Sequence, residues 1–439
     1  MLPLDSDKIN HTKDFLCAKN VLERLPSVFR NQWPDSTCFL IADENTYGVC
    51  GAKVRALLSD SGIALEGEKI YPGRPTLHGD YRHCLELIPE LNRYPRAIPL
   101  VIGSGSLNDI VKRAAYEAER SYAVVATAAS VDGYASDGAA LLENGVKHTM
   151  TCPAPGLILA DTDILATAPW EMTAAGYGDL LAKYPAGGDW ILADLTGLDP
   201  IDPLGWSLVH DRLNEWTSDP EGLARREVRP LVSLFEGLTY AGFAMQYMKQ
   251  SRPVSGAEHL LSHIWEMSGH LYQGEGVSHG FQVSVGSVIC IKLMNYLIHK
   301  DVSSELWDKA LTVYKTPEQR ESGIRGLFDF LDDQKLLFSI NREKSPEKPV
   351  LEKRLHLLRD QWSVLTGRWK EELPSADDFI RKLSTAGCPV HPSDIGVGRA
   401  QVGETLIRAQ YLRNRYTILD LLYEMGLFEN MDEILDVIY

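Results

Sequence analysis

Ile98-Pro99-Leu100-Val101-Ile102, followed by Gly103-Ser104-Gly105-Ser106-Leu107-Asn108-Asp109, is the stretch that decides the fold of this chain. The apolar run has the length and composition of a buried strand, and the two glycines permit a tight turn into a helix that we expect to reach about residue 118. The amides of such a turn, with the N-terminus of the helix, can bind a pyrophosphate. The turn is not the usual GxGxxG of dinucleotide-binding proteins, and a GSGS turn alone is more often a plain connection.

Three further apolar runs also predict buried strands, and they span residues 38–42, 122–126 and 156–161. Helical patterning between the runs, as in residues 51–61, makes a parallel, doubly wound (Rossmann-like) sheet the expected α/β architecture. From Pro169 onward the pattern is nearly all helical. The sequence therefore predicts a Rossmann-like domain over residues 1–165 and an all-α domain over residues 166–439.

Composition limits the classes of partner. The chain has 439 residues, a formal net charge of −16 and seven scattered cysteines without a CxxC pair. The negative charge argues against nucleic-acid binding and attachment to anionic membranes, but it leaves room for small anionic ligands. The cysteines fit neither a disulfide framework nor a thiolate zinc site. With no secretory leader pattern and no uninterrupted apolar run of membrane-spanning length, the sequence predicts a cytoplasmic protein.

Polar residues follow the predicted strands, and ligands on parallel sheets bind at the carboxyl ends of the strands. Asp43 follows the run at 38–42 and suits two roles equally well, a hydrogen-bond acceptor for an adenosine ribose or a helix cap. Residues 127–136 place small hydroxyl residues around Asp132. Such a loop suits hydrogen bonds to ligand hydroxyls, although an ordinary serine-rich loop looks similar.

A carboxylate and several histidines form a candidate metal-binding set. Asp179 follows the glycines of residues 174–183, where we expect it at the start of a helix, and alone it is most often a helix cap. His259 and His263 are four residues apart and therefore share a helix face, with His279 further along the chain. The histidine pair alone is more often coincidental, but an Asp/His/His set has the ligand types of a divalent metal site.

Several motifs occur in a fixed order along the chain. They are residues 103–109, 127–136 and 175–183, Asp189-Trp190, residues 258–263 and His279-Gly280. In this order they resemble the sn-glycerol-1-phosphate dehydrogenases, which belong to the superfamily of dehydroquinate synthase, glycerol dehydrogenase and iron-containing alcohol dehydrogenases. Residues 408–420 resemble the bacterial AraM-type members more closely. The resemblance implies the dehydroquinate synthase-like fold, in which an α/β dinucleotide-binding domain precedes a helical domain that carries metal and substrate.

The resemblance also implies a metal-dependent oxidoreductase that uses NAD or NADP. The positions that match cofactor contacts are Asp43, Gly105, Ser106, Asp109, Thr127, Ala128, Ser130 and Ser136. The metal ligands match Asp179, His259 and His279, which suit zinc best, with nickel or iron as alternatives. The expected substrate contacts are Asp132, Asp179, Lys183 and His263, of which Asp132 and His263 are the expected catalytic residues.

Lys183 bears on the substrate class. It lies four residues after Asp179, where the iron-containing alcohol dehydrogenases carry a fourth, histidine ligand. A protonated lysine cannot bind a metal but can contact an anion, which favours a three-ligand site and a phosphorylated substrate. The implied activity is NAD(P)H-linked reduction of dihydroxyacetone phosphate to sn-glycerol 1-phosphate by hydride transfer.

The alternatives are a dehydroquinate synthase-type cyclase, a dehydrogenase of another polyol or polyol phosphate, and a non-catalytic binding protein.

Asp43 favours NAD over NADP, because a carboxylate there would repel a 2′-phosphate. A homodimer is expected from the frequency of two-fold oligomers.

Three further features have structural interpretations. Residues 341–349 are polar, charged and broken by prolines, which predicts an exposed connection between helices. Arg408, Arg413 and Arg415 are interpreted as salt-bridging or subunit-contact residues of a C-terminal helix rather than as a phosphate site. His270, on much the same helix face as His263, is interpreted as a structural or surface residue.

Overall fold

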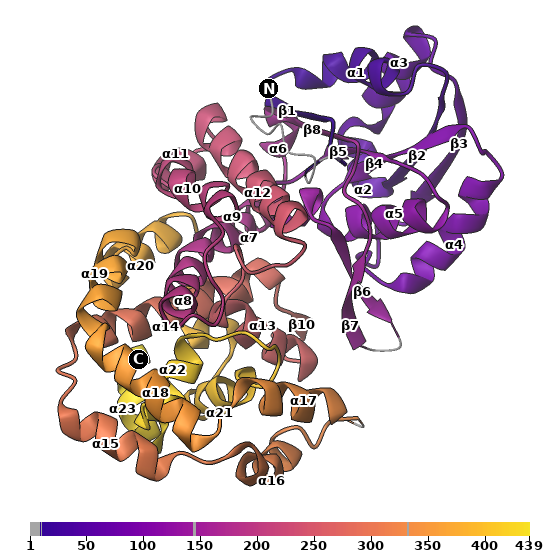
Figure 1. Cartoon of the computed structure of the whole chain (residues 1–439). Helices are drawn as coiled ribbons and strands as arrows, with labels where there is room; N and C mark the ends of the chain where they lie inside the picture. Colours follow the sequence, from indigo (N-terminus) through magenta and orange to yellow (C-terminus); the bar gives the residue numbers. More distant parts are fainter. Residues whose placement is uncertain (1–8, 10, 144–145, 332) are drawn as a thin grey trace. The chain divides into compact units, whose positions relative to one another are not determined.

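A six-stranded parallel sheet, with the strand order β1-β8-β5-β4-β2-β3, forms the core of the N-terminal part of the chain (Figure 1). Its strands are β1 (Asp14–Ala18), β2 (Thr37–Asp43), β3 (Leu65–Tyr71), β4 (Ala97–Gly103), β5 (Ala123–Ala126) and β8 (Leu157–Asp161). The computed structural model describes residues 9, 11–143, 146–331 and 333–439. The four central strands coincide with the four predicted apolar runs, which confirms the predicted α/β architecture.

The two edge strands, β1 and β3, escape prediction from the sequence. Their residues are mostly partly buried, and those of β3 alternate between partly buried and exposed over much of its length. An edge strand pairs on one side only and is less completely covered, so it needs no continuous apolar run. The continuous apolar run that identifies each central strand is therefore missing from the two edge strands.

Helices cover both faces of the sheet, as expected for a doubly wound architecture. On one face, α1 (Leu25–Gln32) and α3 (Ala52–Asp60) pack together, and a buried apolar cluster joins them to β2, β4, β5 and β8. On the other face, α4 (Tyr81–Asn92) packs on α5 (Gly105–Glu117), which in turn contacts β4 (Figure 1). Because successive side chains of each central strand point to opposite layers, both sets of positions are apolar.

An antiparallel hairpin, which the sequence does not predict, lies between β5 and β8 in the chain. Its strands are β6 (Gly138–Glu143) and β7 (Val146–Thr151). β6 contacts α4 and α5. The hairpin therefore continues the layer of helices on that face and does not join the main sheet.

Contacts divide the chain into two compact units. The sheet unit comprises Met1–Leu180 and Asp211–Ser251, and the helical unit comprises Leu181–His210 and Arg252–Tyr439. The sheet unit extends past the predicted boundary at residue 165, because α12 (Val228–Met248) packs on β1, on α6 (Thr162–Leu165) and on the 3-10 helix η3 (Asp132–Ala135). Phe235 of α12 stacks on Phe15 of β1, with ring centroids 6.2 Å apart.

The other helices of the sheet unit are α2 (Glu44–Thr46), α7 (Trp170–Leu181), α10 (His210–Trp216) and α11 (Pro220–Ala224). The helical unit contains α8 (Lys183–Leu195), α9 (Pro203–Ser207), α13 (Ala257–Met267), α14 (His279–His299), α15 (Ser304–Val313), α16 (Pro317–Leu327), α17 (Lys335–Lys344), α18 (Lys348–Asp360), α19 (Trp362–Glu372), α20 (Ala376–Thr385), α21 (Arg399–Ala409), α22 (Ile418–Glu424) and α23 (Met431–Ile438).

The centre of the helical unit is α14. By length and composition this helix could cross a membrane, with a mean hydropathy of 1.5 in an 18-residue window, but 72% of that window is buried. It packs against α8, α13, α19, α20 and α23. The apolar surface of α14 is therefore accounted for as the core of the helical unit, since a helix that is apolar on all sides needs neighbours on all sides.

The predicted exposed connection at residues 341–349 is wrong in part: residues 342, 343 and 347–349 are exposed, but most of the segment is helical and some of it is buried. α17 continues to Lys344 and α18 begins at Lys348, so only three residues connect them. Asn341 and Ser345 are buried, and Lys344 forms an ion pair of 2.9 Å with Asp420. Charge and proline content predict exposure, but here the polar groups satisfy one another inside the unit.

Lys112 of α5 is a buried cation that ties the helix to the loop after β5. Its side chain is fully buried, and Nζ donates to the carbonyl oxygens of Gly133 (2.6 Å), Ser136 (3.1 Å) and Gly138 (3.0 Å). Asp109, one turn earlier on α5, lies 3.7 Å away. The sequence does not reveal this role, because lysine on an amphipathic helix is normally exposed.

We expect Lys112→Met to destabilise the sheet unit, since each buried carbonyl left without a donor costs about 1–3 kcal/mol. Urea unfolding of the full chain measures the change. Lys53→Met is the matched control, because Lys53 is 51% exposed and forms a surface pair with Glu23, a type worth about 0–1 kcal/mol. Equal shifts in the two variants would contradict the anchoring role of Lys112.

Candidate active site

The carboxyl ends of β2 and β4 mark the point where the chain reverses direction across the sheet. After β2 the chain adds β3 on one side, and it then returns to add β4, β5 and β8 on the other side of β2. Ala42 of β2 pairs with Ile102 of β4. Asp43 and Gly103, the last residues of these two strands, therefore lie at the same edge of the sheet. Ligands of open parallel sheets bind at such a switch point, and the predicted cofactor residues Asp43 and Gly105 lie beside it.

The turn after β4 leads directly into α5. Neither Gly103 nor Gly105 has a positive φ, so the turn does not need glycine for its backbone conformation. A methyl group at Gly103 would lie 2.8 Å from Cδ2 of Leu107, and one at Gly105 would lie 3.0 Å from Cγ1 of Val131. Both glycines therefore lie in close contact with a neighbouring apolar side chain, which would have to shift to accept a larger residue. Ser104 is the N-cap of α5 but makes no side-chain cap hydrogen bond, so the first-turn amides are not capped by this hydroxyl.

Asp43 has the capping geometry that was one of its two predicted roles. Its Oδ1 accepts a hydrogen bond of 2.7 Å from the Thr46 amide, while the Asp43 amide donates to Oγ1 of Thr46 at 3.1 Å. This capping box begins α2. A carboxylate accepts several hydrogen bonds, so the cap and the ribose contact are compatible roles for one side chain.

The loop after β5 brings together most of the remaining predicted cofactor residues. The Thr127 amide donates to the Gly103 carbonyl at 3.1 Å, which joins this loop to the turn after β4. Thr127 and Ala128 are buried, Ser130 is partly buried and Ser106 is exposed. The hydroxyl of Tyr134 donates to the Ala128 carbonyl at 2.9 Å.

Asp109 and Ser136 make structural contacts inside this region. Oδ2 of Asp109 accepts from the Ala140 amide at 3.0 Å. The hydroxyl of Ser136 lies 3.3 Å from Nζ of Lys112 and 3.0 Å from the Gly133 carbonyl. Both side chains thus help to hold the loop onto α5 and β6.

Helix α7 contacts the loop after β5 through a glycine. A methyl group at Gly176 would lie 1.9 Å from the carbonyl oxygen of Ala129, so only glycine permits this approach. One turn later, Oδ2 of Asp179 accepts a hydrogen bond of 3.0 Å from the Asp132 amide. Asp179 lies two residues before the end of α7, so its predicted position at a helix start is wrong. Gly176, one of the glycines that suggested a helix start, serves close packing inside the helix.

Three histidines cluster in the helical unit. His259 and His263 share one face of α13, as predicted, and His279 is the first residue of α14. The ring centroids of His259 and His279 are 5.4 Å apart, those of His263 and His279 are 6.1 Å apart, and those of His259 and His263 are 6.5 Å apart. α14 approaches α13 closely because Gly286 faces the Glu258 carbonyl, which a methyl group would meet at 2.6 Å.

Two carboxylates orient these imidazoles, and the sequence interpretation did not assign them a role. Nδ1 of His259 lies 2.7 Å from Oε1 of Glu258. Glu266 reaches Nδ1 of His279 at 3.3 Å and Nδ1 of His263 at 3.5 Å. An Nδ1–H group that donates to a carboxylate puts the lone pair on Nε2, which is the usual arrangement of metal-binding histidines. The donor chemistry of His259 and His279 therefore fits a divalent metal ion.

The signals for these carboxylates are local spacings. Glu258 immediately precedes His259. Glu266 follows His263 by three residues, which places these two side chains on the same helix face. The link between Glu266 and His279 depends instead on how α13 and α14 pack. Sequence spacing alone does not reveal it.

His263 carries no charge near neutral pH. Burial lowers its pKa to about 3, although Glu266 acts in the opposite direction. Nη2 of Arg413 lies 3.3 Å from Nε2 of His263. An arginine only donates, so Nε2 is the acceptor and the proton of the neutral ring is on Nδ1, toward Glu266.

The three C-terminal arginines occupy two settings. Arg408 lies on α21 and pairs with Glu404 at 3.4 Å, which agrees with the predicted salt bridge. Arg413 and Arg415 lie beyond α21, in the segment that precedes α22, so their predicted helical location is wrong. Arg415 donates to the Ser255 carbonyl next to α13.

Lys183 and His270 also belong to the helical unit. Lys183 is the first residue of α8 and is fully buried. Burial lowers the pKa of His210 to about 3, and the charge of Lys183 acts in the same direction. Nε2 of His270 lies 2.6 Å from the Ile395 carbonyl, which fits its predicted structural role.

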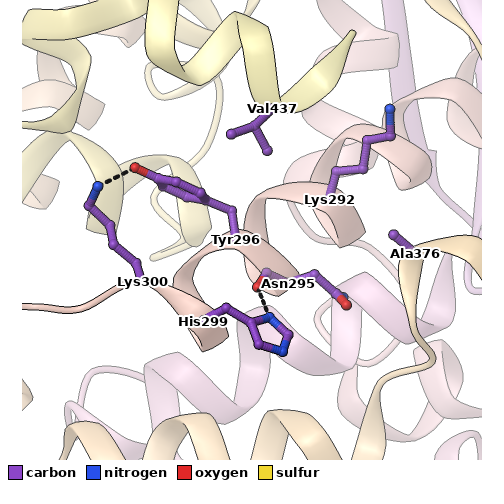
Figure 2. A pocket seen from close by; sticks show the side chains of 7 residues that line it. All are labelled: Lys292, Asn295, Tyr296, His299, Lys300, Ala376 and Val437. Carbon is purple, nitrogen blue, oxygen red and sulfur yellow. Dashed lines mark hydrogen bonds between the residues drawn. The ribbon is translucent and has the colours of Figure 1, made fainter.

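A separate pocket lies at the end of α14, and none of the predicted site residues lines it (Figure 2). Its lysines are engaged within the fold. Nζ of Lys292 donates to the Ile438 carbonyl at 2.6 Å, and Nζ of Lys300 donates to Glu433 at 2.9 Å and to the hydroxyl of Tyr296. These bonds join the end of α14 to α23, so the lysines that line the pocket have a structural role.

The fold and the match to a family profile define the class of protein. The profile of a family described as iron-containing alcohol dehydrogenase matches residues 16–169. The crystal structure of a probable glycerol dehydrogenase from Sinorhizobium meliloti 1021 covers 97% of this chain and 95% of its own, with a TM-score of 0.59 and 15% sequence identity. The chain therefore has the fold of the glycerol dehydrogenases and iron-containing alcohol dehydrogenases.

Two relatives narrow this class. A protein of Geobacillus thermodenitrificans named glycerol-1-phosphate dehydrogenase (NAD(P)+) is 32% identical over 331 residues, which cover 75% of this chain and 72% of the relative. A protein of the same name from Halalkalibacterium halodurans is 28% identical over 424 residues, which cover 96% of this chain and 92% of the relative. The chain belongs to the glycerol-1-phosphate dehydrogenase family.

We expect Glu266→Gln to weaken divalent-metal affinity by about 10–100-fold, because an amide orients a histidine less strongly than a carboxylate does. Competition with a chromogenic chelator measures this affinity on purified full-length protein. Glu371→Gln on α19 is the control, because that side chain is exposed and lies outside the histidine cluster. Unchanged affinity in Glu266→Gln would show that this carboxylate has no part in holding the metal.

Proposed function

We propose that this protein reduces dihydroxyacetone phosphate to sn-glycerol 1-phosphate with NADH or NADPH. The observation that carries the proposal is the pair His259 and His279, whose Nδ1 atoms are held by carboxylates, in a chain of the glycerol-1-phosphate dehydrogenase family. The cyclase alternative lacks comparable support, since both relatives described above are named as dehydrogenases.

The proposed metal ligands are Asp179, His259 and His279. One carboxylate oxygen and two imidazole nitrogens are donors that can hold a divalent ion. Zinc is the proposed metal, with nickel and iron as alternatives that accept the same donors. A bound divalent ion supplies Lewis-acid polarisation of a carbonyl, an effect worth several kcal/mol in such enzymes.

The proposed roles around the substrate go to Asp132, Asp179, Lys183 and His263. Asp132 and His263 orient the substrate hydroxyls, and one of these two residues, or a bound water, relays the proton that the product alkoxide needs. The low pKa of His263 keeps its ring neutral, so it acts through hydrogen bonds rather than as a charged acid. The bond from the Asp132 amide to Asp179 supports the placement of Asp132, because it restrains the backbone at this residue.

The cofactor-binding part of the proposal uses the carboxyl ends of the strands. The proposed contacts are Asp43, Gly105, Ser106, Asp109, Thr127, Ala128, Ser130 and Ser136. The first turn of α5 supplies amides for the pyrophosphate, and Asp43 at the end of β2 supplies a carboxylate for the ribose, which favours NAD.

A cytoplasmic location and a homodimeric state complete the proposal, on the grounds of composition and the frequency of two-fold oligomers.

The decisive assay combines metal analysis with turnover. We expect purified protein loaded with zinc or nickel to oxidise NADH or NADPH in the presence of dihydroxyacetone phosphate, and more slowly with unphosphorylated dihydroxyacetone. Chiral analysis of the product should give sn-glycerol 1-phosphate. A cyclase uses its dinucleotide transiently, so the absence of net oxidation by metal-loaded protein would refute the proposal.

Asp179→Asn tests the carboxylate ligand while preserving its shape. We expect loss of turnover by at least about 100-fold and loss of bound metal, because a neutral amide is a poor ligand for a divalent ion. Glu171→Gln on the same helix is the control, since that side chain is exposed. A folded Asp179→Asn protein that keeps the wild-type metal content would remove Asp179 from the ligand set.

A further inference from the structure

The segment of residues 410–417, between α21 and α22, has no regular secondary structure and carries Arg413 to the histidine cluster. Nη2 of Arg413 lies 3.3 Å from Nε2 of His263. The ring of His263 is itself 6.1 Å from that of His279 and 6.5 Å from that of His259. Arg413 therefore presents a guanidinium one side chain away from the two histidines proposed as metal ligands.

Three guanidinium groups gather in this part of the helical unit. Burial, together with the charges of Arg252 and Arg413, lowers the pKa of Arg415 to about 9. Glu258 and Asp199 partly offset this charge, and Arg252 pairs with Asp199 at 3.0 Å. Gathering like charges in a poorly solvated region is unfavourable unless anions balance them. A bound anion beside Arg413 would add to that balance.

A buried polar network holds the start of the segment in place. Nη2 of Arg320 donates to the side chain of Gln410 at 3.1 Å, and Nε donates to the hydroxyl of Tyr411 at 3.0 Å. Nη1 of Arg320 donates to Ser345 at 2.8 Å, and Nζ of Lys344 donates to the Gln410 carbonyl at 2.9 Å. Arg320 of α16 thus holds the side chains of Gln410 and Tyr411, and Lys344 of α17 holds the backbone at Gln410, three residues before Arg413.

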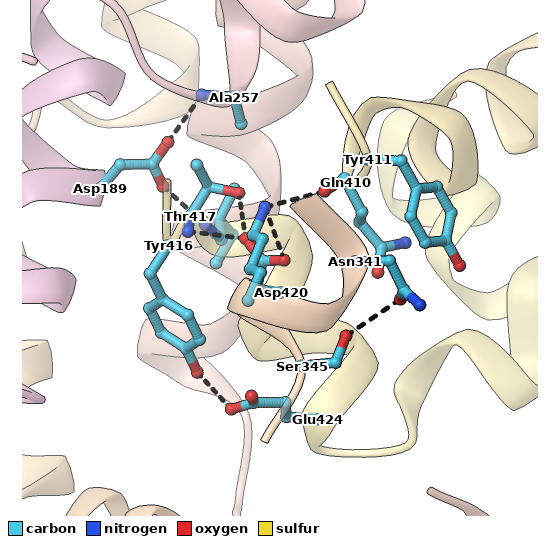
Figure 3. Close-up of polar contacts among 12 residues, drawn as sticks. Asp189, Ala257, Asn341, Ser345, Gln410, Tyr411, Tyr416, Thr417, Asp420 and Glu424 are labelled. Atoms are coloured by element: carbon cyan, nitrogen blue, oxygen red, sulfur yellow. Dashed lines mark hydrogen bonds and ion pairs between the residues drawn. The ribbon is translucent and has the colours of Figure 1, made fainter. Parts of the chain in front are cut away.

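The end of the segment is anchored in the same way (Figure 3). Arg252 donates to the Tyr416 carbonyl at 3.2 Å, and the hydroxyl of Tyr416 donates to Glu424 at 2.6 Å. The amide of Thr417 donates to Asp420 at 2.8 Å in the capping box of α22. Buried hydrogen bonds of this kind restrain the backbone at Tyr416 and Thr417. Arg413 is therefore presented from a segment restrained at both ends.

From this placement we propose that Arg413 binds the phosphate group of the substrate and sets the preference for a phosphorylated over an unphosphorylated ketone. The inference rests on the proposed function. Dihydroxyacetone phosphate carries its phosphate one CH2–O unit from the ketone, so a phosphate contact has to lie beside the carbonyl-binding residues. The planar guanidinium fork matches two phosphate oxygens, which an ammonium group does not. This role replaces the interpretation of Arg413 as a salt-bridging or subunit-contact residue, and it is additional to the contact proposed for Lys183.

The test compares Arg413→Met and Arg413→Lys with wild-type protein, all loaded with zinc and checked for folding by thermal denaturation. The readout is the ratio of kcat/KM for dihydroxyacetone phosphate to kcat/KM for dihydroxyacetone. We expect this ratio to fall by roughly 10–100-fold in Arg413→Met, the size of a hydrogen bond to a charged group. Arg413→Lys should lose less, because it keeps the charge and loses the fork. If Arg413→Met does not fold, the ratio in Arg413→Lys decides.

Arg359→Met is the matched control, because Arg359 is 46% exposed on α18, and it should leave the ratio unchanged. Lys183→Met measures how much Lys183, the other cation proposed to contact the substrate, contributes to the same ratio. An equal loss for both substrates in the Arg413 variants would overturn the inference and reduce Arg413 to a support for His263. An unchanged ratio would overturn it as well.

Binding of inorganic phosphate, measured by calorimetry on the same metal-loaded proteins, separates this inference from the proposed function. Weaker phosphate binding in Arg413→Met supports the anion site even if wild-type protein fails to reduce dihydroxyacetone phosphate, in which case only the function is wrong. Equal phosphate binding by wild type and Arg413→Met refutes the site, whatever the turnover. Wild-type turnover with unchanged selectivity in Arg413→Met leaves the function standing and refutes the site.

Discussion

The contact between Gly176 of α7 and the Ala129 carbonyl is the constraint on which the candidate site depends in the sheet unit. A methyl group at Gly176 would lie 1.9 Å from that oxygen, so the helix and the loop after β5 touch backbone to backbone. This approach lets Asp179 accept the amide of Asp132 at 3.0 Å. The loop is held from its other side by Lys112. The carboxylate of Asp179 is thus positioned by the same contacts that shape the end of the sheet.

In the helical unit the corresponding constraint is the pair of carboxylates behind the histidines. Glu258 and Glu266 set the orientation of three imidazoles that come from the two helices α13 and α14. Asp189 links this arrangement to the C-terminal part of the chain. Its carboxylate accepts from the Ala257 amide at 2.7 Å (Figure 3) and from the Ile418 amide at 2.6 Å. One buried side chain therefore caps both the helix of His259 and the helix that follows the Arg413 segment. Burial, with Glu258 nearby, raises the pKa of Asp189 to about 7.

Different parts of the structure could be predicted from the sequence to different degrees. The central strands were readable because residues buried on both faces form continuous apolar runs, whereas the edge strands β1 and β3 have no such run. The shared face of His259 and His263 follows from helical spacing. Asp179 was expected at a helix start because glycine commonly interrupts helices. Gly176 instead lies inside α7, where tertiary packing outweighs its low helix propensity.

The sequence by itself determined the α/β class, the positions of the central strands, the spacing of the histidines and the family, because these depend on local periodicity and on motifs in a fixed order. Only the tertiary structure decided that Glu266 holds His279, that Lys112 is buried, and that Arg413 contacts His263. These pairs join residues on different helices or loops, and their contacts depend on how closely the helices pack. Charged side chains are normally exposed, but a buried polar group is stable wherever the fold supplies its hydrogen-bond partners.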